Sequence, residues 1–220
     1  MIALEFESVS KMYGPRAVLS GISFRVESGE RITILGPSGC GKTTILRLIA
    51  GFVAPDRGVI RIQGQDVAAD GKILIDPSAR SLGMVFQDLA LWPHLTVYQN
   101  LEFALKIGGV PEKTRRLRVN EMLTRVRLEG WRDVYPARLS GGQQQRVAIG
   151  RALVALPSAL LMDEPLSNLD DDLKEELTNH ILELHSQLGF TLVYVTHRRE
   201  EMLRIGTRSI LLRDGREVSA

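Results

Sequence analysis

Apolar and polar residues along the chain recur with periods that distinguish strands from helices. Residues 4–14 (LEFESVSKMYG) and 22–36 (ISFRVESGERITILG) alternate in the manner of short strands, and the second segment ends in a β-rich run before a glycine-rich loop. Residues 42–50 (KTTILRLIA) are apolar at helical spacing, and this run stops at Gly51. The pattern therefore predicts a buried strand, a loop and a helix in succession.

The rest of the chain alternates between strand-like and helix-like segments. Further strands are predicted in residues 58–67, 81–87, 158–165, 191–197 and 210–218, the last as a terminal hairpin. Helix-like segments occupy residues 97–107, 115–128 and 171–188, with a break at 108–111. The strand, helix, strand order near the C-terminus predicts parallel strands joined by a crossover helix, whereas residues 96–128 predict a helical insertion.

Composition is that of a globular protein and predicts no membrane span. Hydrophobic residues make up 44% and charged residues 25% of the 220 residues. The longest apolar stretch, Ala152 to Met162, is broken by Pro157 and is shorter than the roughly 18 residues that a span needs. The N-terminus carries no recognisable secretory signal, so the expected compartment is the cytoplasm.

Cysteine content and net charge exclude further classes. The single cysteine, Cys40, rules out an intrachain disulfide and gives no support to a zinc site. The formal net charge is +2, and the basic cluster at 113–118 (KTRRLR) is expected to be a solvated helix face. We therefore expect no nucleic-acid partner.

Residues 36–43 (GPSGCGKT) match the phosphate-loop pattern G-x-x-x-x-G-K-[ST] between a predicted strand and a predicted helix. Glycines let backbone N–H groups turn toward phosphate oxygens, and the helix adds its N-terminal donors and positive dipole end. In phosphate loops generally the lysine, here Lys42, contacts the β and γ phosphates, and the hydroxyl, here Thr43, ligates Mg²⁺. The predicted nucleotide contacts are Gly36, Pro37, Ser38, Gly39, Cys40, Gly41, Lys42, Thr43 and Thr44.

Cys40 is the one nucleophilic residue of this loop. We expect it to be a small, tolerated residue without a redox role. A helix N-terminus is expected to lower its thiol pKa, so that alkylation would block the site sterically.

Polar residues follow three apolar strands of the predicted sheet. Asp163 and Glu164 end one of them, at the edge where doubly wound sheets bind ligands. Neighbouring side chains at a strand end point in different directions, so we expect Asp163 to hold Mg²⁺ through water and Glu164 to polarise the attacking water. His197 and Gln87 end two further strands; His197 is expected to donate to a γ-phosphate oxygen, and Gln87 to complete the metal and water shell.

A second candidate anion site lies in residues 139–146 (LSGGQQQR), which resemble the signature motif that separates ABC (ATP-binding cassette) ATPases from other phosphate-loop proteins. Ser140 offers a hydroxyl, Gly141 and Gly142 expose backbone N–H groups, and Gln143 begins a helix whose positive end faces the motif. The resemblance implies that the signature of one subunit covers the ATP bound by the other. It therefore implies a homodimer or a paired cassette.

The resemblance covers essentially the whole chain in family order, and it implies the architecture. The implied fold is α/β: a P-loop NTPase (RecA-like) core with an antiparallel β subdomain and a helical insertion subdomain. A single domain is expected over residues 1–220, with the core at about 1–87 and 151–220 and the helical subdomain at about 88–150. The family pattern further implies that Tyr13 stacks on adenine, that Asp170 communicates across the dimer, and that His197 holds the γ-phosphate. ATP and Mg²⁺ are the implied cofactors.

A finer resemblance, in residues 77–105, is to the ATP-binding subunits of sugar, polyamine, iron and anion importers. It implies a permease partner whose helix docks in a groove lined by Leu91, Trp92, Pro93 and His94, a solute-binding protein in the same system, and a peripheral place on the cytoplasmic face of the inner membrane. Coverage of this apolar segment by the chain itself is the alternative. An exporter or lipoprotein-releasing subunit, and a soluble ABC ATPase outside transport, are the alternative functions.

The chain departs from the importer pattern in several places. Arg198 and Arg199 stand where Asp-Gln commonly follows the histidine, and Thr207 replaces an acid. Gly150 replaces a helix-favouring alanine, which costs about 1 kcal/mol in a helix interior. The sequence stops at Ala220, so no C-terminal regulatory domain is expected in it. None of these departures removes a predicted catalytic group.

Overall fold

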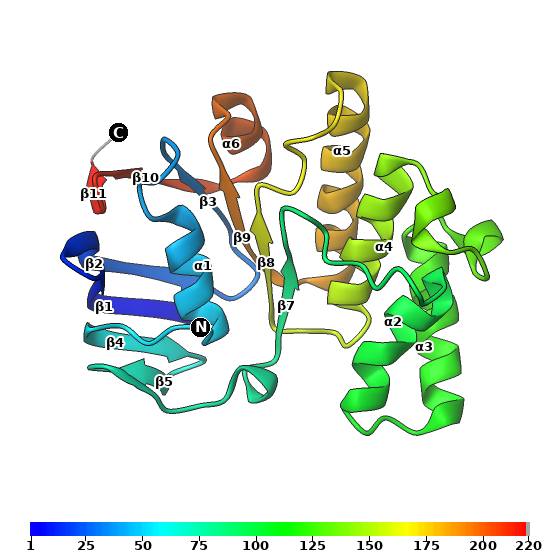
Figure 1. The fold of residues 1–220 in the computed structure, drawn as a ribbon, viewed down its shortest axis with the longest axis horizontal. Coiled ribbons are helices and arrows are strands. Elements are labelled where there is room, and N and C mark those ends of the chain that lie inside the picture. Colours follow the sequence, from blue (N-terminus) through cyan, green and yellow to red (C-terminus); the bar gives the residue numbers. More distant parts are fainter. Residues whose placement is uncertain (219–220) are drawn as a thin grey trace.

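The computed structural model describes residues 1–218, in which two β-sheets are joined and flanked by helices (Figure 1). Ser219 and Ala220, the end of the predicted domain, lie outside the described residues. The strands are β1 (Ile2–Tyr13), β2 (Arg16–Glu27), β3 (Arg31–Leu35), β4 (Arg57–Ile62), β5 (Gln65–Ala69), β6 (Lys72–Ile73), β7 (Leu82–Val85), β8 (Ala159–Asp163), β9 (Thr191–Thr196), β10 (Arg208–Arg213) and β11 (Arg216–Val218). The α-helices are α1 (Lys42–Ala50), α2 (Val97–Ile107), α3 (Glu112–Arg125), α4 (Gly141–Leu153), α5 (Asp171–Leu188) and α6 (Arg199–Ile205).

The central sheet has the strand order β11-β10-β3-β9-β8-β7. The four pairings from β10 to β7 are parallel, and β11 closes the edge of the sheet as an antiparallel hairpin with β10. Every residue of β8 and β9 is buried, because helices cover both faces of the sheet. The expected crossover β8, α5, β9 and the expected terminal hairpin are therefore confirmed.

The second sheet is antiparallel, with the order β2-β1-β4-β5-β6. Its longest pair is the β1–β2 hairpin, whose inner face alternates apolar residues. Phe6 and Phe24 stand directly opposite each other across this hairpin, and their rings stack with centroids 4.6 Å apart. The hairpin brings its turn, next to Tyr13, to the edge of a pocket beside the 36–43 loop.

Helix α1 lies between the two sheets (Figure 1) and has the predicted bounds. It ends at Gly51, which adopts φ 81° and donates its backbone N–H to the last turn. Arg80 supplements this cap, because its guanidinium donates to Leu48 O at 3.1 Å and Ile49 O at 2.8 Å. A buried arginine thus satisfies carbonyl groups that the helix end leaves free.

Helices α2, α3 and α4 lie together beyond β7 (Figure 1) and share a second apolar core. Gly150, in the interior of α4, lets this helix approach its neighbours. A Cβ added at Gly150 would lie 3.3 Å from Val126 Cγ1 and 3.4 Å from Leu101 Cδ2, tighter than most Cβ contacts. The helix-propensity cost at this position is therefore accompanied by close packing. Within residues 1–218, no helix is long and apolar enough to cross a membrane.

Candidate functional site

The candidate site lies at the carboxyl edge of the central sheet, where loops from adjacent strands meet. The phosphate loop follows β3, and its neighbour β9 leads into His197. The next strand, β8, ends at Asp163 and is followed by Glu164, while β7 precedes Gln87. Because these strands are parallel, their carboxyl ends share one edge, and residues distant in the sequence become neighbours.

Two glycines of the phosphate loop lie where a side chain would clash with neighbouring residues. Gly36 leaves no room for a side chain, since an added Cβ would lie 2.3 Å from Leu212 O. Gly41 adopts φ 111° immediately before α1, a conformation that favours glycine. The sequence pattern therefore has a steric cause in this fold, and the backbone N–H groups at the start of α1 face the site.

Lys42 is the first residue of α1, and its side chain is only 5% exposed. Its ammonium donates to Gly36 O at 2.8 Å and to Pro37 O at 3.2 Å. It also lies 3.3 Å from Glu164 Oε1. The lysine charge is thus folded back into the loop and paired with a carboxylate that comes from β8.

Glu164 is held from both sides. Its Oε2 lies 2.9 Å from His197 Nδ1, opposite the contact with Lys42. Its backbone adopts φ 44°, a left-handed conformation, and its N–H donates to Val195 O at 3.0 Å. The strand thus ends in a strained residue whose direction is set by the neighbouring strand, which is typical of functional positions.

Asp163 faces a different partner from Glu164, as the strand-end geometry predicts. The Thr43 hydroxyl donates to Asp163 Oδ1 at 3.0 Å. Burial raises the pKa of Asp163 above its usual value; the Thr43 hydrogen bond opposes this shift and the Glu164 charge adds to it. Thr43, Asp163 and Gln87 border one hollow of about 570 Å³ that Arg47 and Asn168 also line. A hydroxyl, an amide oxygen and a buried carboxylate form the kind of ligand set that Mg²⁺ prefers, so the residues fit this ion.

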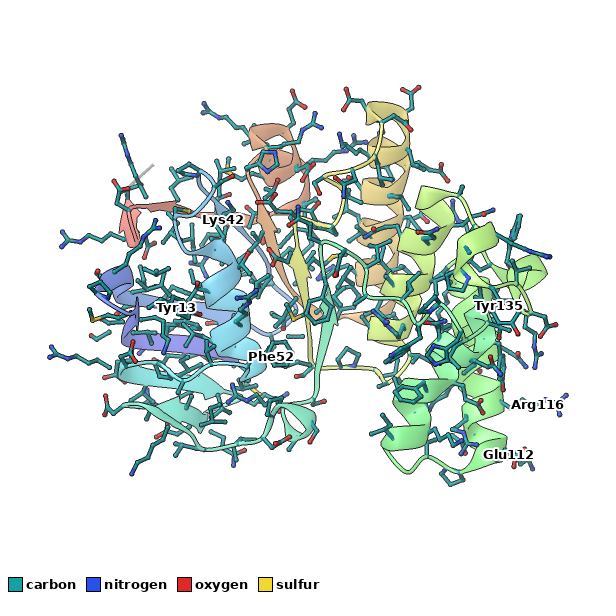
Figure 2. All side chains as sticks on the ribbon, viewed as in Figure 1. Tyr13, Lys42, Phe52, Glu112, Arg116 and Tyr135 are labelled. Atoms are coloured by element: carbon teal, nitrogen blue, oxygen red, sulfur yellow. The ribbon has the colours of Figure 1, made fainter. Side chains whose placement is uncertain are left out.

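A pocket of about 420 Å³ opens beside the phosphate loop. Its walls combine the loop and the start of α1 with Glu164, Gln87 and the β1–β2 turn. Tyr13, with 44% of its surface exposed, is the last residue of β1 in the antiparallel sheet and lines the same pocket as Lys42; both residues are labelled in Figure 2. Ser38, Gly39, Gly41, Lys42, Thr43 and Thr44 line the same pocket. The predicted aromatic and phosphate-binding residues are therefore brought together.

Cys40 differs from expectation. It is buried, and burial raises the pKa of its thiol, outweighing the charge of Lys42. The expected lowering by the helix N-terminus is therefore wrong, because Cys40 lies inside the turn of the loop, away from water. A buried thiol with a raised pKa forms less of the reactive thiolate, which agrees with the expected absence of a redox role.

The signature residues occupy the N-terminus of α4. Ser140 is the N-cap: its hydroxyl accepts from Gln143 N at 3.3 Å, and Gln143 Oε1 accepts from Ser140 N at 3.0 Å. A Cβ at Gly142 would lie 2.8 Å from Leu173 Cδ1, so this glycine allows α4 to pack on α5. Among the described residues, none of the signature positions lines the pocket beside the phosphate loop. The two candidate anion sites are therefore separate within one chain.

Asp170 has a local role that the sequence also encodes. Its carboxylate caps α5 by accepting from Leu173 N at 2.9 Å. The preceding segment 165–169 connects this cap to Glu164, and Ser167 N donates to Glu164 O at 3.2 Å. Asp170 is thus fixed relative to both the β8 strand end and the signature helix.

The segment after Gln87 borders an apolar hollow. A hollow of about 380 Å³ is lined mainly by Leu82, Gly83, Met84, Phe86, Ala90, Trp92, Ala104, Arg151, Ala152 and Ala155. Trp92 packs on Phe103 with ring centroids 4.4 Å apart, and the Arg151 guanidinium lies 5.0 Å from its ring. Leu91, Pro93 and His94 are not among these lining residues, so only Trp92 of the four predicted groove residues lines this hollow. Leu91 packs inward against the second core.

A wider hollow of about 840 Å³ lies over β1 and β2, remote from the phosphate loop. It offers no free cation to a phosphate, because its guanidinium groups are already paired. The pairs are Arg25 with Glu5 at 2.7 Å, Arg61 with Glu7 at 2.7 Å and Arg208 with Glu30 at 2.7 Å. The chemistry therefore favours the smaller pocket at the sheet edge.

Comparison with known proteins identifies the family. The profile of the family described as ABC transporter matches residues 19–167, more than half of the chain. The chain belongs to the ABC transporter family. The sequence resemblance in residues 139–146 is thereby confirmed, and so is the predicted P-loop fold class with its antiparallel sheet and helices.

Curated relatives of this ABC family member are importer subunits. It is 43% identical over 214 residues to the Fe(3+) ions import ATP-binding protein FbpC of Fusobacterium nucleatum, a match that covers 97% of the chain and 56% of the relative. It is 45% identical over 213 residues to the spermidine/putrescine import ATP-binding protein PotA of Pseudomonas aeruginosa, with 97% and 57% covered. The chain thus spans slightly more than half the length of these relatives.

Solved ABC cassettes share the fold over almost the whole chain. The cassette cbiO1 of Clostridium perfringens, part of the ABC transporter complex cbiONQ, is 30% identical with a TM-score of 0.89, covering 99% of this chain and 87% of cbiO1. MJ0796, a bacterial ABC transporter cassette with a dimeric structure, is 33% identical with a TM-score of 0.85, covering 98% of this chain and 97% of MJ0796.

Two site residues were missed from the sequence. Arg16 lines the pocket and lies 3.5 Å from Gly39 O, and Arg47 borders the hollow that contains Asp163. The spacing of Arg16, three residues after Tyr13 in a turn, was a usable clue. Arg47 is one turn after Thr43 in α1 and therefore lies on the same helix face.

Proposed function

We propose that the chain is the ATP-binding and ATP-hydrolysing subunit of an ABC importer. The observation that carries this proposal is the meeting of Lys42, Glu164 and His197 at one sheet edge, while the signature residues stand apart in the same chain. Family membership supports ATP binding, and the importer names of the relatives support the direction of transport.

Nucleotide binding follows from the pocket. The phosphate loop and the start of α1 supply backbone N–H groups to the phosphates, while Lys42 supplies a positive charge. Tyr13 gives the adenine a ring surface at the pocket edge. Ser38, Thr43 and Thr44 add hydroxyl donors to the same wall.

Hydrolysis requires a base and a way to disperse the charge of the phosphate oxygens. Glu164 orients and polarises the attacking water, because its carboxylate stands between Lys42 and His197 at the sheet edge. His197 donates to a γ-phosphate oxygen once it releases Glu164. Thr43, Asp163 and Gln87 would hold Mg²⁺, which neutralises charge on the phosphate oxygens when it is bound.

A second subunit completes the site. Ser140, Gly141, Gly142 and Gln143 stand at a helix N-terminus, with Ser140 exposed. In a dimer this terminus covers the γ-phosphate of the partner's nucleotide, and Asp170 communicates between the two sites. ATP binding would close the dimer and hydrolysis would open it.

Coupling to transport is assigned to the helical part, residues 88–150. The groove that contains Trp92 offers an apolar surface to a helix of a membrane permease. The subunit would thus be peripheral at the cytoplasmic face of the inner membrane, with a solute-binding protein in the same system. The core, residues 1–87 and 151–220, would carry the nucleotide.

Two variants mixed together test the shared site. Lys42→Ala removes the loop charge and Ser140→Ala removes the signature hydroxyl, so each variant alone is expected to hydrolyse ATP poorly. A mixed dimer contains one site with both defects and one intact site. An equimolar mixture should therefore recover up to about one quarter of the wild-type rate, since half of the dimers are mixed.

Controls separate the two parts of this proposal. Glu164→Gln should abolish hydrolysis while ATP still drives dimer formation, measured by sedimentation. No recovery in the mixture would contradict the shared site, and normal hydrolysis by Glu164→Gln would contradict the role of Glu164. Stimulation of the ATPase by a copurified permease would test coupling.

A further inference from the structure

Arg198, directly after His197, is a departure from the importer pattern that the site described above leaves unused. It occupies the N-cap of α6 without making a side-chain cap bond. A cation at a helix N-terminus gains nothing from the helix dipole. Its guanidinium is nevertheless 29% exposed and ordered by specific partners.

The principal partner is Asp171, the first residue of α5. Arg198 Nη1 and Nη2 lie 3.1 Å and 3.2 Å from Asp171 Oδ1. This hydrogen bond lowers the pKa of the Asp171 carboxyl, so the group is ionised at neutral pH. A second acid, Glu200, lies 3.3 Å from Nη2. The contact joins the segment after β9 to the first turn of α5.

A hydrogen-bond network that includes Thr196 and Glu201 holds the backbone of Arg198. Its N–H donates to Thr196 Oγ1 at 3.0 Å, and this hydroxyl donates to Glu201 Oε2 at 2.8 Å. The buried phenol of Tyr194 donates to the same carboxylate oxygen at 3.1 Å. Arg198 Nε lies 3.9 Å from Glu201 Oε1. The backbone of Arg198 is therefore fixed, and its side chain extends toward α5.

The two ends of one loop are thus tied to the same neighbour. Glu164, where the loop 164–170 begins, is held by His197 at 2.9 Å. Asp171, where α5 begins, is held by the next residue, Arg198. Between them lies Asp170, which caps α5.

We infer that Arg198 is a positioning residue that clamps the loop 164–170 to the His197 segment within one subunit. This inference rests on the proposed function for its catalytic consequence, because the loop carries Glu164 and Asp170. The clamp fixes the geometry of groups that act on the γ-phosphate, so its loss alters turnover more than nucleotide binding. The clamp acts within one subunit and needs no partner chain.

The test compares Arg198→Ala and Asp171→Asn with a matched control, Arg204→Ala. Arg204 also joins α6 to α5, through Glu175 at 2.8 Å and Asn179 at 2.9 Å, but one turn or more away from the loop. Hydrogen exchange of backbone amides 165–170 is measured on each folded variant. Arg198→Ala and Asp171→Asn should speed this exchange by about five-fold, whereas Arg204→Ala should leave it unchanged.

Steady-state kinetics supply the second readout. Arg198→Ala should lower kcat by about five-fold with KM nearly unchanged, and the charge swap Arg198→Asp with Asp171→Arg should restore much of it. Unchanged exchange in Arg198→Ala, or equal effects of Arg204→Ala, would overturn the clamp. A wild-type chain without ATPase activity would refute the proposed function, while the exchange measurement would still decide the inference.

Discussion

The Lys42 ammonium lies 3.3 Å from Glu164 Oε1, with 5% and 17% of the two side chains exposed. The proposed phosphate-binding cation and the proposed base are therefore paired with each other in this structure. In the proposed function, an incoming γ-phosphate would compete with Glu164 for Lys42, and its charge would also repel that carboxylate. ATP binding and the release of Glu164 would then be one coupled event.

Glu164→Gln should tighten ATP binding by about ten-fold, because it removes a negative charge close to the γ-phosphate and frees Lys42. ADP affinity should change less, since ADP lacks the group that faces this residue. Equilibrium titration in a Ser140→Ala background measures the effect without a contribution from dimer closure. Equal gains for ATP and ADP would contradict this account.

Arg16→Ala should weaken binding of ATP and ADP by about five-fold. Arg16 lies in the wall of the nucleotide pocket, where its guanidinium donates to Gly39 O at 3.5 Å. Its guanidinium is thus available to a phosphate or the ribose. Adenosine, which lacks phosphates, is the control ligand: an equal loss of adenosine affinity would assign Arg16 to the nucleoside instead.

Asp163→Asn should stabilise the metal-free chain by about 1 kcal/mol while abolishing Mg²⁺-dependent hydrolysis. Burial raises the pKa of Asp163 in the folded chain, so the stability linked to this group is complete below the ordinary value of 3.8 and is lost as the pH rises through the raised pKa. At neutral pH a buried charge therefore opposes folding. The asparagine still accepts the Thr43 hydrogen bond without that charge.

Denaturant unfolding in EDTA, and again with Mg²⁺ and ATP, checks the effect. The variant should be the more stable protein in EDTA and should gain less from Mg²⁺ and ATP than the wild type. Thr43→Ser, which keeps the hydroxyl, is the matched control. A variant that is less stable in EDTA would show that the carboxylate charge supports the fold.

Much of this architecture was predictable because local patterns and tertiary structure agree. The helix bounds at 42–50 and 171–188 follow from glycine and aspartate caps that the chain itself carries. The strand ends of Asp163, Glu164 and His197 followed from apolar runs, and parallel pairing brought them to one edge. Hydrophobic periodicity, helix caps and strand order all predicted the same arrangement of elements.

Contacts between side chains that are distant in the sequence could not be predicted from it. Leu89 and Ala90 both adopt left-handed backbone conformations, and this turn decides whether Trp92 or Leu91 faces the groove. Arg151, from α4, donates hydrogen bonds to the carbonyls of both residues. No pattern in residues 86–95 encodes that turn. The pKa of Cys40 was misjudged for a similar reason, since burial within the loop outweighs the helix terminus.

His180 should make the stability of the fold depend on pH below neutrality. It lies buried between α4 and α3, where Arg146 donates to Nδ1 and Nε2 therefore donates to Arg125 O at 2.7 Å. Burial lowers the pKa of His180 and the hydrogen bond to Arg125 O opposes this shift, while the charges of Arg146 and Arg127 add to it and Glu183 opposes it. Protonation of Nδ1 would break the bond from Arg146, which also pairs with Glu176.

The sign follows from the lowered pKa. Stability from neutral His180 is complete above its ordinary value of 6.5 and is lost as the pH falls from there through the folded pKa. Unfolding free energies of the wild type and His180→Gln, measured from pH 8 to pH 5, test this. The glutamine cannot ionise, so the wild type should lose more stability than the variant on acidification. Parallel curves would contradict the role of His180 and would place the pH dependence at another group, with His185 the next to substitute, because burial lowers its pKa too.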